Sequence, residues 1–167
     1  MSDNSAKLLK ELISSKAIEE IDQWIAKYPA DQKQSAVMRG LMIIQEEKNH
    51  LTPPLMDALA SYLDMPPIAV YEVATFYSMY EHKPHPRHTI NVCTNISCML
   101  SGSNDVVKYL ENKLDVSLGG NTNDGRFALR SVECLGACVN APMMQIDKDY
   151  HENLTHEKID QAIEEYK

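Results

Sequence analysis

The chain has 167 residues, of which 44% are hydrophobic and 24% are charged, and its formal net charge is −8 at pH 7. A chain of this length can form one domain or two small ones. The acidic balance argues against nucleic acid as a partner, because nucleic-acid binding requires a basic surface. The first residues lack the charged and apolar regions of a signal peptide, and no apolar run approaches the roughly 18 residues of a spanning helix. We therefore expect an intracellular protein that does not insert into a membrane.

The first half of the chain is predicted to be all-helical, because its apolar residues recur at helical spacing. Thr52 is a predicted N-cap residue with Pro53 at the first helical position. Pro66 and Pro67 end one helix and begin the next. The predicted helices cover residues 5–28 and 32–48, the stretch from Thr52 to Leu63, and the stretch from Pro67 to Tyr77. This half contains no cysteine and no plausible catalytic set.

Residues 81–88 mark a change in composition. The run His82-Lys-Pro-His-Pro-Arg-His88 has two prolines and no apolar periodicity, which predicts a linker. Its three histidines could ligate a metal, but the prolines prevent a helical ligand face, so a solvated linker is the favoured interpretation. The predicted organisation is a helical domain at residues 1–80, this linker, and a second domain at residues 89–167.

The second half alternates between strands and helices, which is typical of a small α/β layer structure. A glycine-rich loop at residues 119–125 lacks the G-x-G-x-x-G and P-loop patterns, so a nucleotide site there is not favoured. Strands are predicted at residues 89–93, 127–133 and 143–147, and helices at residues 103–115 and after Thr155, which is a predicted N-cap.

The four cysteines are the most informative feature, because they form two close pairs far apart in the chain. Four residues separate Cys93 from Cys98, and three separate Cys134 from Cys138, with thirty-five between the pairs. Four thiolates gathered at one place can hold an iron–sulfur cluster or a structural zinc ion. The spacings match neither the usual zinc pattern nor the common ferredoxin runs, and a disulfide framework suits smaller secreted chains. On spacing alone, all three interpretations stay open.

Apolar residues flank both pairs, and Gly136 lies inside the second pair. Glycine lets the backbone pass close to a sulfur atom without a side chain in the way. The apolar flanks predict a weakly solvated pocket, which would tune a redox centre; ordinary core is the alternative interpretation. The flanking residues are Met99, Leu100, Leu135, Ala137 and Val139.

Several motifs together point to one family. They are Cys93-Thr94, Glu133-Cys-Leu-Gly-Ala-Cys138, Ala141-Pro-Met-Met-Gln-Ile-Asp147, Val73-Ala-Thr-Phe-Tyr77 and Asp124-Gly-Arg-Phe127. As a set they resemble the thioredoxin-like [2Fe-2S] subunit of NADH:quinone oxidoreductase, which is the E-subunit family of bacterial complex I. The resemblance runs from about the first helices to the C-terminus. Thioredoxin-like ferredoxins share only the later half, and the stretch Val73–Tyr77 favours the full subunit.

The resemblance implies an α/β fold in which an N-terminal helical bundle precedes a thioredoxin-like [2Fe-2S] ferredoxin domain. It implies a [2Fe-2S] cluster as the cofactor and metal centre. Cys93 and Cys98 would bind one iron, and Cys134 and Cys138 would bind the other.

Two further expectations concern the surroundings of this centre. The Ala141–Pro142 bond lies just before a predicted strand, where its place resembles the cis-proline of thioredoxin folds, so we predict a cis bond. A cluster that moves single electrons needs no general acid, nucleophile or substrate pocket. The chain offers none, so no residue is predicted to be catalytic.

By resemblance, the function is electron transfer within NADH:quinone oxidoreductase. The implied partners are the flavin-carrying, NADH-oxidising subunit, with which one electron is exchanged, and other peripheral-arm subunits. The implied location is cytoplasmic, on the inner membrane as part of the complex. An equivalent subunit of a soluble NAD-linked hydrogenase or formate dehydrogenase is one alternative. A zinc-stabilised interaction module is another.

Overall fold

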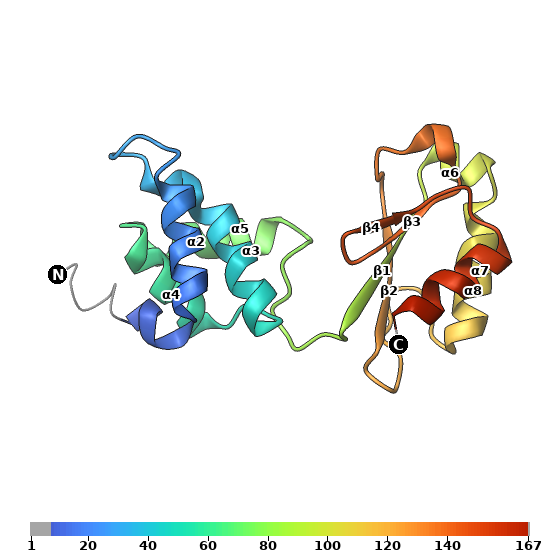
Figure 1. The fold of residues 1–167 in the computed structure, drawn as a ribbon, viewed down its shortest axis with the longest axis horizontal. Helices are drawn as coiled ribbons and strands as arrows, with labels where there is room; N and C mark the ends of the chain where they lie inside the picture. The colour runs from blue at the N-terminus through green and yellow to red at the C-terminus, as the bar shows by residue number, and fades with distance from the viewer. Residues whose placement is uncertain (1–7, 167) are drawn as a thin grey trace. The chain divides into compact units, whose positions relative to one another are not determined.

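The computed structural model describes residues 8–166, which form two compact units divided between Pro84 and His85 (Figure 1). The first unit is helical, and the second packs helices on a four-stranded sheet. The predicted α/β class with an N-terminal helical bundle is therefore confirmed. The division falls inside the segment 81–88, for which the sequence predicts a linker. Among the described residues, no helix is long and apolar enough to cross a membrane.

The first unit packs its helices around one apolar core, in which side chains such as Ile21 and Leu41 are fully buried. Thr52 is the N-cap of the helix that Pro53 begins, as predicted, although its side chain makes no capping hydrogen bond. The elements are α2 (Ser15–Ile25), the 3-10 helix η1 (Lys33–Ala36), α3 (Val37–Lys48), α4 (Pro53–Tyr62) and α5 (Pro67–Phe76). The helix predicted for residues 32–48 is thus split into η1 and α3.

The helix predicted for residues 5–28 is wrong in its length, because Ser14 interrupts it. Residues 8–12 are helical, Ser14 is extended, and α2 starts at the next residue, while the first positions of the prediction lie outside the described residues. The Ser14 hydroxyl accepts a hydrogen bond from the Ala17 amide at 3.2 Å and caps α2. The Ser14 amide and hydroxyl donate to the Glu47 carboxylate at 3.1 and 2.7 Å. These bonds favour a new helix start over a continuous helix.

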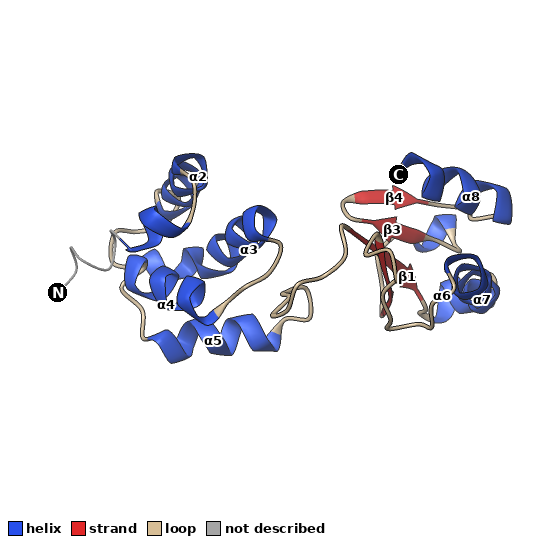
Figure 2. Ribbon diagram, turned by 90° about the horizontal axis from the view of Figure 1, so that it is seen from below, coloured by secondary structure: helices blue, strands red, loops and turns tan. Residues whose placement is uncertain are grey.

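The second unit is built on a mixed sheet with the strand order β2-β1-β3-β4. Its strands are β1 (His88–Cys93), β2 (Phe127–Val132), β3 (Met144–Ile146) and β4 (Asp149–His151). β1 pairs in parallel with β2 and antiparallel with β3, which forms an antiparallel hairpin with β4. The helices are α6 (Ile96–Leu100), α7 (Ser103–Leu114), the 3-10 helix η2 (Cys138–Asn140) and α8 (His156–Glu165). Figures 1 and 2 show α7 and α8 against the same face of the sheet.

A second apolar core joins this sheet to its helices. Ile90 and Val92 on β1 are fully buried and belong to the same cluster as Leu110 on α7 and Ile159 on α8. Side chains alternate across a strand, so Asn91, which lies between them, faces the other side of the sheet. The apolar alternation of β1 therefore determines which face the helices cover.

The sequence prediction omits β4 and α6. β4 consists of Asp149, Tyr150 and His151, whose polar character gives no strand alternation, and α6 has only five residues. Thr155 caps α8, as predicted, by accepting a hydrogen bond from the Lys158 amide at 3.3 Å. The predicted strands, and the helix predicted for residues 103–115, agree with the structure to within one residue at each end.

Ser14→Ala should lower the stability of the first unit by about 1 kcal/mol in neutral solution, the usual contribution of an N-cap. Partial burial alone would raise the pKa of Glu47, but hydrogen bonds from Ser14 and Lys48 hold it below its ordinary value. A lowered pKa means that this contribution is complete at neutral pH and is lost as the pH falls through the pKa of Glu47. Urea unfolding at neutral and at acidic pH measures both effects.

A double-mutant cycle with Glu47→Gln provides the control. If the cap and the carboxylate act together, the double variant loses less stability than the sum of the single losses. Strictly additive losses would show that Ser14 and Glu47 act independently, and would contradict this account of the helix break.

Candidate metal centre

Each cysteine pair begins at or just after the end of a strand, as the predicted strands 89–93 and 127–133 imply. Cys93 is the last residue of β1, and Cys134 follows the end of β2 by two residues. The strands are parallel and Cys93 is paired with Val132, so both strands end at the same edge of the sheet. Cys98 lies on α6, and Cys138 begins η2. Strand pairing therefore brings together two pairs that thirty-five residues separate.

The two pairs differ in burial. Cys93 and Cys98 are buried and pack with Met143 in a small apolar cluster. Cys134 and Cys138 are exposed. All four cysteines are free, so the disulfide interpretation does not describe this structure. The centre thus has one side inside the fold and one side at the surface.

The buried thiols interact with members of the exposed pair. Burial, together with the thiols of Cys93 and Cys138, raises the pKa of Cys98 to about 11. Burial would also raise the pKa of Cys93, but backbone N–H donors and the thiols of Cys98 and Cys134 hold it below its ordinary value. Each buried thiol therefore interacts with its own partner and with one thiol of the other pair.

Backbone N–H groups point at two of the sulfur atoms. The Gly136 amide donates to Cys134 Sγ at 3.3 Å, and the amides of Asn95 and Leu135 donate to the Cys93 thiol. Gly136 has a φ of 81°, a backbone conformation that residues other than glycine rarely adopt. N–H donors stabilise negative charge on sulfur, so these loops are suited to thiolates.

Thr94 and Asn95 connect the end of β1 to α6 and hold the first pair in place. The Thr94 amide donates to the Val132 carbonyl oxygen at 3.1 Å, which extends the strand pairing beyond Cys93. The Asn95 side-chain oxygen accepts a hydrogen bond from the Ile96 backbone N–H at 2.7 Å and caps α6. This cap starts the single turn that places Cys98 in the interior.

Residues 150–154 hold the loop of the second pair, and sequence reasoning missed them. The Tyr150 hydroxyl donates to the Leu135 carbonyl oxygen at 2.7 Å. No sequence motif identifies residues 150–154 as contacts of this loop, because several of them bond through backbone atoms, which every residue type has. The Ala141–Pro142 bond in this loop is cis, which confirms the prediction. The side-chain amide of Asn140 donates a hydrogen bond to the Glu152 carboxylate at 2.7 Å. Two backbone bonds add to it: the Asn153 N–H donates to the Asn140 carbonyl oxygen at 2.8 Å, and the Leu154 N–H donates to the Pro142 carbonyl oxygen at 3.0 Å.

The predicted apolar pocket forms only in part. Leu135 and Ala137 are partly buried and pack against the buried cysteines. The prediction is wrong for Val139 and Leu100, which are 97% and 79% exposed, and Met99 is exposed as well. α6 is a single turn on the surface, so its other side chains point away from the core. The residues next in sequence to Cys98 and Cys138 therefore present apolar side chains at the surface.

His82 and His88 of the predicted linker each lie beside a partner other than a cysteine. His82 Nε2 lies 3.0 Å from the Ala74 carbonyl oxygen. His88 begins β1, rather than lying in a linker, and its Nδ1 is 2.6 Å from Asp147 Oδ2. Since Cys93 ends the same strand, the two lie at opposite ends of β1. Within residues 8–166, no three or more His, Cys, Asp or Glu side chains are arranged around a single metal ion.

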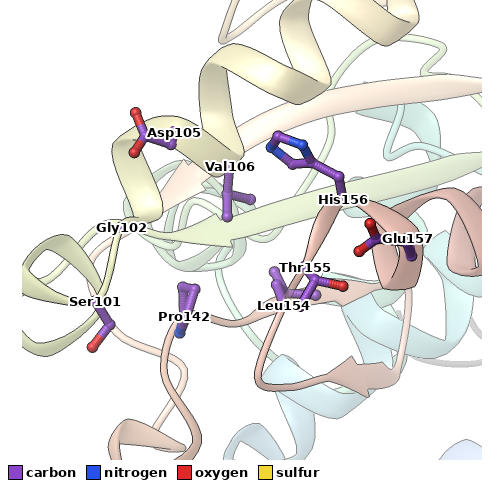
Figure 3. Close-up of a pocket in the computed structure, with 9 residues that line it drawn as sticks. All are labelled: Ser101, Gly102, Asp105, Val106, Pro142, Leu154, Thr155, His156 and Glu157. Carbon is purple, nitrogen blue, oxygen red and sulfur yellow. The ribbon is translucent and has the colours of Figure 1, made fainter.

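A cavity of about 380 Å³ lies at the N-terminal ends of α7 and α8 (Figure 3). Gly102, Thr155 and Pro142 line it, together with the acidic residues Asp105 and Glu157. None of the four cysteines lines this cavity. It is therefore separate from the candidate metal centre.

The donor set of the centre consists of thiols alone, supplied as two pairs. Thiolates select zinc or iron–sulfur clusters over hard cations. A [2Fe-2S] cluster takes four cysteine thiolates, and this chain brings two from each strand end with N–H donors beside them. The chemistry of the donor set therefore fits such a cluster.

The comparison with known families agrees with this chemistry. Residues 21–167 match the family model of the thioredoxin-like [2Fe-2S] ferredoxins. The chain belongs to this family. The matched residues include all four cysteines and most of the helical unit.

Curated relatives of this ferredoxin family align with nearly the whole chain. The E subunit of the NADH-quinone oxidoreductase of Rickettsia felis is 46% identical over 143 residues, which are 85% of this chain and 86% of the relative. The corresponding E 2 subunit of Rhizobium meliloti is 42% identical over 89% of this chain and 88% of its own length. The E subunit of Rickettsia conorii is 40% identical over 96% of each chain.

Solved structures show the same fold. The NAD+-reducing [NiFe]-hydrogenase in its H2-reduced state contains a chain that superposes with a TM-score of 0.67 at 20% identity. The match covers 82% of this chain and 22% of the hydrogenase chain. The air-oxidized state gives a TM-score of 0.62 at 19% identity. This chain therefore spans about a fifth of the hydrogenase chain, and the likeness is one of fold.

Cys138→Ser should damage a metal centre built from the four thiols. A serine oxygen is a harder ligand than a thiolate and suits iron in a sulfide cluster poorly. We expect loss of the metal or a marked change in the EPR signal of the reduced protein, with the helical unit still folded. Val139→Ser is the matched control, because Val139 is adjacent, 97% exposed and without sulfur. Visible absorption and EPR spectra of the full chain measure the effect.

A second control distinguishes a cysteine site from a mixed one. His85→Ala should leave the spectrum unchanged, because the predicted ligands are all cysteines. A native spectrum in the Cys138 variant, with a lost spectrum in the His85 variant, would replace the four-cysteine assignment by a cysteine–histidine site.

Proposed function

We propose that Cys93 and Cys98 bind one iron of a [2Fe-2S] cluster, and that Cys134 and Cys138 bind the other. The observation that carries this proposal is the parallel pairing of β1 and β2, which brings both pairs to one edge of the sheet. Membership of the thioredoxin-like [2Fe-2S] ferredoxin family supports the choice of cofactor. When bound, the cluster supplies a centre that accepts and releases one electron.

The chain's own residues set the environment of this centre. The buried first pair keeps water away from one side, and the N–H groups of Leu135 and Gly136 stabilise negative charge on the sulfur atoms. The exposed second pair leaves the other side open to a partner. This arrangement suits electron exchange across a protein–protein contact.

The proposed role is that of the E subunit of an NADH:quinone oxidoreductase. Relatives that carry this name are 40–46% identical and are matched over most of their length. The chain would act as one member of a multisubunit oxidoreductase and carry electrons within it. The isolated chain would bind neither NADH nor quinone.

The proposed partner is the flavin-carrying, NADH-oxidising subunit, docked against the exposed cysteines. Exposed apolar side chains close in sequence to Cys98 and Cys138 support a contact there, because apolar surface patches mark interaction sites. We call this set the apolar rim. It consists of Ile96, Met99, Leu100 and Val139.

The remaining parts of the proposal concern organisation and location. Residues 1–80 and 89–167 would be separate domains joined by the segment 81–88, whose last residue, His88, also begins β1. The helical domain would contact further subunits of the peripheral arm. The assembled complex would hold the chain at the cytoplasmic side of the inner membrane.

A second candidate is the equivalent subunit of a soluble NAD-linked hydrogenase or formate dehydrogenase. This candidate is supported by the likeness in fold to a chain of the NAD+-reducing [NiFe]-hydrogenase. Affinity purification of the chain from its native cells distinguishes the two. Co-purification of a quinone-reducing complex supports the first candidate, and co-purification of a hydrogenase or formate dehydrogenase supports the second.

Anaerobically purified full chain should be reddish-brown and contain about two irons and two acid-labile sulfides, as a [2Fe-2S] cluster on cysteine thiolates requires. Metal and sulfide analysis, with EPR of the reduced protein, measures this. One zinc, no sulfide and a colourless protein would refute the cluster and support a zinc-stabilised interaction module instead.

Val139→Asp and Leu100→Asp should each weaken binding of the flavin-carrying subunit by about tenfold or more, as expected for residues central to an interface. Both side chains are largely exposed, so the fold and the cluster spectrum should be unchanged. Leu118→Asp is the matched control, since Leu118 is partly exposed in the same unit and lies outside the apolar rim. Binding measured with the purified partner tests this; equal affinities for all three variants would place the contact elsewhere.

A further inference from the structure

One peptide group connects the Tyr150 side chain to a candidate ligand. The Tyr150 hydroxyl donates to the Leu135 carbonyl oxygen at 2.7 Å. The N–H of the same peptide group belongs to Gly136, and it donates to Cys134 Sγ at 3.3 Å. A peptide group is planar, so a hydrogen bond that orients its carbonyl also orients its N–H toward the sulfur.

The loop that carries this peptide has little regular structure of its own. Residues 134–137 belong to no helix or strand, and Cys134 and Gly136 are exposed. Gly136 has a φ of 81°, and apart from the glycine itself and its two chain neighbours no atom lies within 4 Å of the place where a Cβ would stand. Glycine in open space leaves the peptide free to rotate. A hydrogen bond from outside the loop therefore helps to hold this peptide in one orientation.

Tyr150 is well placed to supply that bond. It lies on β4, where it pairs with Gln145 of β3. The next residue toward the turn, Asp149, accepts a hydrogen bond from the Tyr166 hydroxyl of α8 at 2.6 Å. Neighbouring strand residues point to opposite faces, so β4 is held to α8 on one face while Tyr150 reaches the cysteine loop from the other.

We propose that Tyr150 is a positioning residue that holds the Gly136 N–H on Cys134 Sγ and thereby raises the reduction potential of the centre. The proposal rests on the proposed role of Cys134 as a ligand. An N–H donor stabilises the extra negative charge of the reduced state, so it favours reduction. A hydrogen bond at the carbonyl polarises the peptide and strengthens its N–H as a donor.

Tyr150→Phe tests the proposal, because it removes only the hydroxyl from a side chain that is 50% exposed. The reconstituted full chain should show a more negative midpoint potential and changed g-values in the reduced-state EPR spectrum. Loss of iron to a chelator should be about two- to tenfold faster, the factor that one ordinary hydrogen bond supplies. Tyr166→Phe is the matched control, since its hydroxyl bonds the same hairpin without reaching the cysteine loop; its potential and g-values should equal those of the parent.

A measurement without the cluster separates this proposal from the proposed function. In the cluster-free full chain, amide hydrogen exchange at Gly136 should be faster in Tyr150→Phe than in the parent or in Tyr166→Phe. If the parent binds no cluster, the proposed function fails, and faster exchange at Gly136 still supports the positioning role. Unchanged exchange, or a cluster-loaded Tyr150→Phe with the parental potential and EPR signal, overturns the proposal.

A second variant keeps the test decisive if Tyr150→Phe folds poorly. A fluorinated tyrosine at position 150 has a more acidic phenol and is a stronger donor to the Leu135 carbonyl. It should shift the midpoint potential in the positive direction, opposite to Tyr150→Phe. A negative or absent shift in a folded, cluster-loaded protein would contradict the proposed relay.

Discussion

The parallel register of β1 and β2 is the constraint on which the candidate centre depends. Ile90 is paired with Leu129, and both are fully buried beneath the helices. A slip by one residue would turn the buried side chains of one strand to the open face of the sheet, so core packing holds the register. The same register pairs Cys93 with Val132 and starts both cysteine loops at one edge. Apolar packing several residues away therefore determines where the sulfur atoms lie.

The unequal burial of the two pairs follows from the elements that carry them. Cys93 belongs to a central strand, and Cys98 sits on the inner side of α6, so both are enclosed with Met143. Cys134 and Cys138 lie in a loop and at the start of a 3-10 turn, where the chain leaves the sheet. A centre of this design is anchored in the core and open at the surface, which a redox centre needs if it is to be both stable and reachable.

The features that the sequence predicts are those with local causes. Prolines and N-caps locate the starts of α4, α5 and α8, and the alternation in β1 ends at the first cysteine. The features that it misses depend on distant partners. The break at Ser14 relies on Glu47, thirty-three residues away, and the exposure of Val139 depends on how η2 leaves the sheet. Resemblance to a known family, rather than a local pattern, predicts the cofactor and the cis bond at Ala141–Pro142.

The hairpin of β3 and β4 has two structural roles: it forms one edge of the sheet, and it leads into residues that bond the loop of the second cysteine pair. No sequence motif predicts either role. An edge strand exposes unpaired backbone groups and invites association with other chains; β4 is short and polar, and Asp149 is tied to Tyr166 of α8. The residues that follow also bond the loop of the second cysteine pair, through the backbone of Asn153 and the side chain of Glu152. The edge strand β4 and the residues that follow it therefore also support the exposed half of the centre.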